Sequence, residues 1–82
     1  EGHTDSIPII AGRFKDNWDL STERALSVVR FLIDQGIEPQ RLSATGYGEF
    51  QPLQNLDTDL SQEQKNSKNR RIEIKLTQRI VD

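Results

Sequence analysis

Residues 16–35, DNWDLSTERALSVVRFLIDQ, constrain this chain most, because they predict one amphipathic helix. Asp16 is a good N-cap, Gly36 follows where a left-handed C-terminal residue is favoured, and Pro39 lies just beyond. At about 100° per residue, the large apolar side chains fall on one arc of this helix. That arc consists of Trp18, Ala25, Val28, Val29 and Leu32. We expect it to face the core, with Trp18 buried there.

Two shorter segments alternate between apolar and polar residues, as strands do. Residues 70–77, RRIEIKLT, place isoleucine and leucine on one face and charged side chains on the other. Residues 41–45, RLSAT, alternate in the same way and end at Gly46. One solvent-exposed face is typical of an antiparallel or mixed sheet that is covered by helices on its other side.

Two further segments are predicted to be loops. Residues 6–12 form an apolar stretch interrupted by proline and glycine, which suits a loop that packs down or meets a partner. Residues 50–69 are rich in Gln, Asn, Asp and Ser, and predict a long surface loop with a helical turn near residues 60–66.

Size and charge limit what such a chain can be. With 82 residues, of which 33% are hydrophobic, we expect one domain over residues 1–82 with a small core. The net charge of −2 disfavours a nucleic-acid-binding protein. The chain has no cysteine, which excludes disulfides and thiolate metal sites. It begins with Glu1, and we expect it to be a piece of a longer protein.

Asp5 and Arg24 form the first candidate site. Arg24 lies on the seam between the apolar and polar arcs of the helix, on the flank of Asn17 and Leu20. If Asp5 ends a strand beside the helix, the two charges can line one pocket. Such a pocket suits a zwitterion, because Asp5 can accept from an ammonium and Arg24 can bind a carboxylate. The alternative is that Asp5 caps a turn and Arg24 makes a structural ion pair.

Catalytic and metal sites have weaker support. His3 could join Asp5 or Glu49 in an acid–base pair or a metal site, but one histidine without cysteine is a poor set of metal ligands. Ser21 and Ser43 lack the context of a nucleophile. We therefore expect no enzyme, cofactor or metal.

Three roles are possible for Asn69, Arg70 and Arg71. They could bind phosphate, blunt the edge of a strand, or complete the pocket of Asp5 and Arg24.

Four motifs, in order along the chain, resemble the family of OmpA-like peptidoglycan-binding domains. They are Gly2-His3-Thr4-Asp5, Asn17-x-x-Leu20-Ser21-x-x-Arg24-Ala25, Gly46-Tyr47-Gly48-Glu49-x-x-Pro52 and Asn69-Arg70-Arg71-Ile72-Glu73. Within the family, the spelling around residues 3–9 and 14–21 is most similar to the flagellar stator branch, MotB.

The resemblance implies an α+β fold, in which a mixed β-sheet with a βαβ core is covered on one face by helices. The family's first strand and helix would precede this chain. It also implies non-covalent binding of the diaminopimelate in the peptidoglycan stem peptide, with the glycan in the same groove. By position, Asp5 and Arg24 are the principal ligands. The implied pocket is completed by Thr4, Asn17, Leu20, Ser21, Asn69 and Arg70.

The implied role is a non-enzymatic anchor that holds a membrane protein to the cell wall. The rival hypothesis is a cell-wall hydrolase that uses His3, Asp5 and Glu49. The parent protein would be a flagellar stator of the MotB type, or else an outer-membrane anchor of the OmpA or lipoprotein type. The domain would lie in the periplasm of a Gram-negative bacterium. A homodimer is also implied, with residues 7–10 as a candidate interface.

Overall fold

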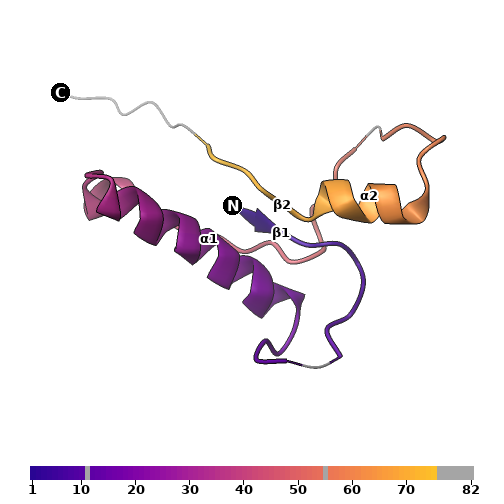
Figure 1. Ribbon diagram of the computed structural model, residues 1–82, viewed down its shortest axis with the longest axis horizontal. Helices are drawn as coiled ribbons and strands as arrows, with labels where there is room; N and C mark the ends of the chain where they lie inside the picture. The colour runs from indigo at the N-terminus through magenta and orange to yellow at the C-terminus, as the bar shows by residue number, and fades with distance from the viewer. Residues whose placement is uncertain (11, 55, 76–82) are drawn as a thin grey trace.

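The computed structural model describes residues 1–10, 12–54 and 56–75. It confirms a mixed α+β fold in which a long helix and a two-stranded antiparallel sheet pack together (Figure 1). The elements in chain order are β1 (Gly2–His3), α1 (Asn17–Asp34), the 3₁₀-helix η1 (Pro39–Arg41), α2 (Gln62–Asn69) and β2 (Arg71–Ile72). None of the helices in these ranges is long and apolar enough to cross a membrane.

The ends of α1 confirm the predicted helix. At its start, the backbone N–H of Asp19 donates to the carboxylate of Asp16 at 2.8 Å. At its end, Gly36 has φ +103° and donates to the Ile33 carbonyl, while Ile37 donates to the Leu32 carbonyl. These two bonds form a Schellman motif, which satisfies carbonyls that the last turn would leave unpaired.

The face that α1 buries is smaller and more polar than predicted. Its buried residues are Asn17, Ser21 and Ala25. The prediction that Trp18 belongs to the core is wrong, because its side chain is about half exposed and stacks on Phe50 at a ring distance of 5.0 Å. Polar side chains occupy this face because it meets loop backbone, which offers hydrogen-bonding groups that must be satisfied.

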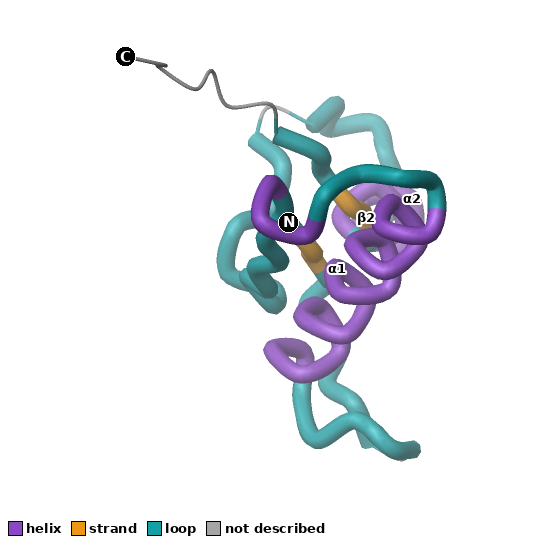
Figure 2. The backbone as a smooth tube through the Cα atoms, turned by 90° about the vertical axis from the view of Figure 1, so that its left-hand side faces the viewer, coloured by secondary structure: helices purple, strands orange, loops and turns teal. Residues whose placement is uncertain are grey.

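The sheet is short, and β1 lies between β2 and the segment around Gly46. Gly2 pairs with Ile72 and His3 with Arg71 in antiparallel register. The backbone bonds between Glu1 and Glu73 extend the pairing by one position, at 2.8 Å in each direction. The strand predicted over residues 70–77 is therefore present only in part, and its last two residues lie outside the described residues. Figure 2 shows the two strands lying beside α1.

The strand predicted over residues 41–45 is wrong. This stretch begins in η1 and continues without strand structure, and it meets β1 only through an isolated parallel bridge between Gly2 and Gly46. The βαβ connection is reduced to this single bridge.

The helical turn expected near residues 60–66 is present as a longer element, the eight-residue helix α2, and the described residues before it form the expected loop. Ser61 and Gln64 form a complete capping box at its start. Only Asn66 of this helix is buried, so α2 is held by its ends more than by an apolar face.

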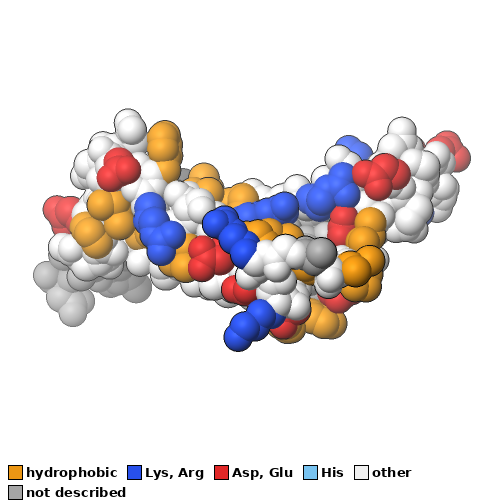
Figure 3. All heavy atoms as spheres, turned by 60° about the horizontal axis from the view of Figure 1, so that its bottom comes forward, with side chains coloured by type: hydrophobic (Ala, Val, Ile, Leu, Met, Phe, Trp, Pro, Cys, Tyr) orange, Lys and Arg blue, Asp and Glu red, His pale blue; other side chains and the backbone are white. Residues whose placement is uncertain are grey.

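A groove of about 250 Å³ lies between α1 and the sheet. The apolar side chains that line it are Ala25, Val28, Val29 and Leu32 of α1, with Leu42, Ile72 and Ile74 opposite. The predicted apolar arc of α1 thus faces the sheet, as expected, but the residues opposite cover it incompletely. Figure 3 shows hydrophobic side chains reaching the surface at several places among charged ones.

Candidate ligand-binding site

Asp5 lies just after β1, at the start of the loop that leads to α1, and it is only 8% exposed. One carboxylate oxygen, Oδ1, accepts from the backbone N–H of Ile7 at 3.0 Å. The other, Oδ2, accepts from Nη1 of Arg70 at 2.7 Å. Asp5 thus closes a local turn, as one of the two alternatives expected, and it pairs with Arg70, while its role as a ligand of an ammonium stays a prediction.

Arg70 is the cation that the structure places beside Asp5. It is the C-cap of α2, so the helix end fixes where its side chain starts. Its second terminal nitrogen, Nη2, donates to Glu63 at 2.9 Å. The hydrogen bonds to Glu63 and Asp5 raise the pKa of Arg70 above its already high value. Two carboxylates and one guanidinium therefore form a chain of charges from buried to exposed.

Asn17 and Thr4 hold the backbone around Asp5. The side-chain amide of Asn17 donates to the carbonyls of Asp5 at 3.3 Å and Ile7 at 3.2 Å. The Thr4 hydroxyl donates to the Asp5 carbonyl at 2.8 Å, and both residues are buried. The first turn of α1 is in this way tied to the end of β1, which fixes the direction of the Asp5 side chain.

Ser21 joins three segments at the floor of the site and is fully buried. Its hydroxyl donates to the Trp18 carbonyl and accepts from the backbone N–H of Gly48 at 2.9 Å. A Cβ added at Gly2 would lie 2.1 Å from the Ser21 carbonyl oxygen, and one at Gly46 would lie 2.6 Å from the Ser21 hydroxyl. Glycine at these two positions lets β1 and the segment around Gly46 lie close to α1.

Arg24 lies seven residues after Asn17 on α1, which is about 10 Å along the helix axis. It is exposed, and it takes part in no ion pair or side-chain hydrogen bond among the residues described. Leu20 is half-buried on the same helix. The pocket expected between Asp5 and Arg24 stays a prediction, with Arg70 as an additional cation at its Asp5 end.

Asn69 lies one residue before Arg70 and accepts a hydrogen bond from the loop around Leu53. Its side-chain oxygen accepts from the backbone N–H of Leu53 at 2.8 Å. The structure places Arg70 beside Asp5, and the three interpretations of this region stay predictions. The contribution of Glu63 was missed, although the spacing Ser61-x-x-Gln64 is a capping-box signal and could have predicted α2.

The hypothesis that His3 joins Asp5 or Glu49 in a site does not match the geometry of its side chain. Its Nε2 instead lies 3.6 Å from a Glu73 oxygen and 3.8 Å from a Glu1 oxygen. Burial, followed by the nearby charge of Arg71, lowers the pKa of His3. The His3 side chain therefore takes no part in the site around Asp5.

The region around Asp5 can act as a polar receptor. A buried carboxylate accepts from cationic donors, and Arg70 and Arg24 offer guanidinium groups that suit carboxylates. A ligand with an ammonium and a carboxylate would match this distribution of charge.

Comparison with known proteins supports one family over most of the chain. A family model described as OmpA family matches residues 1–72. Motility protein B of Bacillus subtilis is 39% identical over 74 residues, which cover 89% of this chain and 27% of that protein. The peptidoglycan-associated lipoprotein of Pseudomonas aeruginosa is 36% identical over 75 residues, covering 92% of this chain and 40% of that protein.

Among solved structures, a MotB-like protein from Desulfovibrio vulgaris matches with a TM-score of 0.68 and 44% identity. The match covers 84% of this chain and 42% of that one. The chain thus spans less than half the length of each of these relatives. The motifs from Gly2 to Ile72 lie within the matched range.

Proposed function

Because the chain belongs to the OmpA family, we propose that it is a non-enzymatic module that binds peptidoglycan and anchors its parent protein to the cell wall. The name of the lipoprotein relative supports peptidoglycan as the ligand. Similarity to Motility protein B and to the MotB-like structure supports a flagellar stator as the parent protein. Residues 1–82 act as one binding domain in this proposal.

The observation that carries the proposal is the buried carboxylate of Asp5, tied to α1 and to the end of α2. Diaminopimelate of the stem peptide carries an ammonium and a carboxylate on one centre. In the proposed complex, the ammonium binds Asp5, and the carboxylate binds the exposed guanidinium of Arg24. Thr4, Asn17 and Ser21 fix the Asp5 loop, Leu20 lines the pocket, and Asn69 and Arg70 form its rim.

The site of action in this proposal is the cell envelope. The finer expectation of a periplasmic domain in a Gram-negative bacterium stays a prediction, because the relatives include a Bacillus subtilis protein. Homodimerisation through residues 7–10 also stays a prediction. Ile7 and Ile10 of this loop are exposed, which leaves them accessible to a partner.

Co-sedimentation with purified sacculi that contain diaminopimelate tests the proposal. We expect the native chain to pellet and Asp5→Asn and Arg24→Ala to bind roughly tenfold more weakly or worse, because hydrogen bonds to charged groups contribute about 1.5–3 kcal/mol. Arg30→Ala is the matched control, since Arg30 is also exposed on α1 but lies on its water-facing arc. Circular dichroism checks that each variant is folded.

Competition separates the zwitterion from a general cation effect. Free diaminopimelate should release the chain from sacculi, whereas cadaverine, which has two ammonium groups but no carboxylate, should release much less. Equal pelleting of the native chain and both variants would overturn the assignment of Asp5 and Arg24. Failure of the native chain to pellet would overturn peptidoglycan binding itself.

A further inference from the structure

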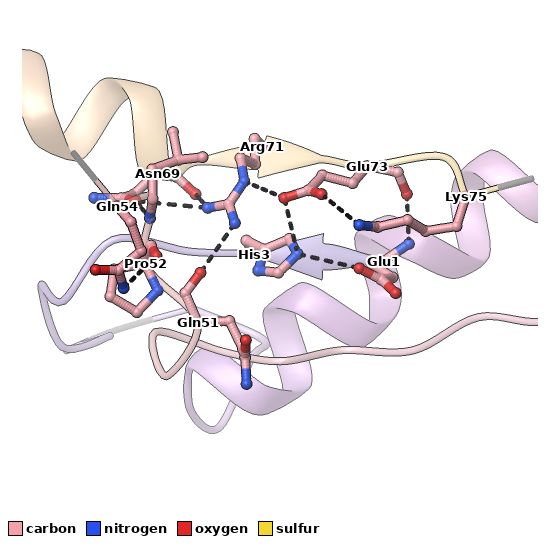
Figure 4. Close-up of polar contacts among 10 residues, drawn as sticks. Glu1, His3, Gln51, Pro52, Gln54, Asn69, Arg71, Glu73 and Lys75 are labelled. Carbon is pink, nitrogen blue, oxygen red and sulfur yellow. Dashed lines mark hydrogen bonds and ion pairs between the residues drawn. The ribbon is translucent and has the colours of Figure 1, made fainter. Parts of the chain in front are cut away.

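A second polar cluster lies on the sheet, away from the bonds that hold Asp5. Glu1 and His3 are two residues apart on one strand and so point to the same face. Glu73 is hydrogen-bonded directly opposite Glu1 on the neighbouring strand. The register Gly2–Ile72 therefore places one imidazole and two carboxylates on a single face (Figure 4). One ligand atom from each of the three lies within 4.8 Å of the others.

The imidazole at the centre of this cluster lacks a partner. His3 is 97% buried, with 3% of its residue surface exposed, and it stacks on Tyr47 at a ring distance of 5.2 Å. Neither ring nitrogen has a hydrogen-bond partner in the described part of the chain. An unpaired polar group in such a place is destabilising, and a bound ligand would offset that cost.

The distances fit a shared ion better than direct hydrogen bonds. Nε2 of His3 is 3.8 Å from Glu1 Oε1 and 3.6 Å from Glu73 Oε2, which is too long for a hydrogen bond. Ligand atoms at about 2.1 Å from a tetrahedral zinc ion lie about 3.4 Å from each other. The offered oxygens of Glu1 and Glu73 lie within 4.8 Å of each other, so the two carboxylates would move closer together around a shared ion.

We propose that Glu1, His3 and Glu73 bind one divalent transition-metal cation, with zinc(II) as the best-matched ion. The ligand set of one imidazole and two carboxylates suits zinc and leaves a position for water, whereas magnesium prefers oxygen ligands alone. The inference does not depend on peptidoglycan binding, because none of these side chains contacts Asp5 or Arg24 among the described residues.

Two cations beside Glu73 shape the site and limit its affinity. Arg71 donates from Nε to Glu73 Oε2 at 2.6 Å and from Nη2 to the Gln51 carbonyl at 2.9 Å. A carboxylate oxygen can bind a metal and accept a hydrogen bond together, so Arg71 orients this ligand. Lys75 lies 3.3 Å from the other oxygen with an exposed side chain, and it can move away into water.

Isothermal titration of the tag-free protein with zinc chloride tests the proposal, with cobalt(II) absorbance as a measure of coordination. We expect one equivalent of zinc to bind, and magnesium to give no signal. Glu1→Gln should weaken zinc binding roughly tenfold or more, because a ligand is lost. Glu38→Gln is the matched control, since its carboxylate is exposed and, among the residues described, hydrogen-bonds to Gln40 alone.

The chain contains one histidine, so nuclear magnetic resonance can assign the ligand without a substitution in the core. We expect the Nε2 resonance of His3 to shift in proportion to added zinc, in both the native chain and Glu38→Gln. The proposal is overturned if the native chain binds no stoichiometric zinc, if Glu1→Gln binds as tightly as the native chain, or if the His3 resonance does not move.

Discussion

Gly2 allows the closest approach in the molecule between β1 and α1. A methyl group at this position would lie 2.1 Å from a backbone oxygen of Ser21, and backbone cannot rotate away as a side chain can. We expect Gly2→Ala to lower the free energy of unfolding by about 2–3 kcal/mol, as overpacking in a core does.

Urea unfolding followed by circular dichroism measures this cost. Ser6→Ala is the control, because Ser6 is exposed and its substitution should change stability by less than about 0.5 kcal/mol. A Gly2→Ala variant as stable as the native chain would show that β1 does not press against Ser21.

His3 gives the stability of the metal-free chain a pH dependence. Burial, together with the charge of Arg71, holds the pKa of folded His3 below its ordinary value of 6.5, although Glu73 and Glu1 oppose the shift. Between the two pKa values the unfolded chain binds more protons, so stability is complete above pH 6.5 and falls as the pH falls toward the folded pKa.

Urea unfolding between pH 8 and pH 5 in the presence of EDTA should show this loss. The pKa of Glu73 is lowered by the hydrogen bond from Arg71, so a further loss should follow when that carboxylate is protonated in more acidic solution. A resonance titration that gives His3 a pKa at or above 6.5 would contradict the first of these effects.

At the scale of elements, α2 depends on its cap. The helix has eight residues and buries only Asn66, so packing adds little to hold it. We expect Ser61→Ala to cost about 1 kcal/mol and to speed hydrogen exchange of the α2 amides. Ser67→Ala is the matched control, since Ser67 is exposed inside the same helix and should leave exchange unchanged. Equal exchange in both variants would mean that the capping box does not hold the helix.

The helices and strands differ in how far the sequence could predict them. The signals for α1 are local, because Asp16 and Gly36 act on backbone within a few residues of themselves. Strand length depends on a partner that lies far along the chain, so the alternation over residues 41–45 overestimated what the two residues of β1 could pair. The helix α2 lacks an apolar stripe, and its composition therefore resembled a loop.

The candidate site was predictable only in outline. The motifs placed Asp5, Asn17 and Ser21 in one region, and the structure brings them together around the end of β1. The pair of Asp5 with Arg70 spans 65 residues, so spacing alone could not separate it from a pair with Arg24. The cluster of His3 with Glu1 and Glu73 depends on strand register, which short strands do not reveal.

At the scale of the whole molecule, the groove between α1 and the sheet leaves apolar surface open to solvent. We expect an apolar dye such as anilinonaphthalene sulfonate to brighten with the folded chain. Leu32→Gln should weaken this signal, because Leu32 lines the groove, whereas Ile10→Gln should not, because Ile10 lies in the distant loop. A folded chain that leaves the dye dark would show that the groove is closed.

The central position of β1 also decides how the molecule carries tension. The hydrogen bonds of Glu1 with Glu73, and of Gly2 with Thr45 and Tyr47, lie on both sides of the strand and across its direction. A pull applied at Glu1 and resisted at Asp5 runs along this strand, so it shears those bonds together instead of opening them one by one. A wall-bound module built in this way would resist a steady load best when the load enters through β1.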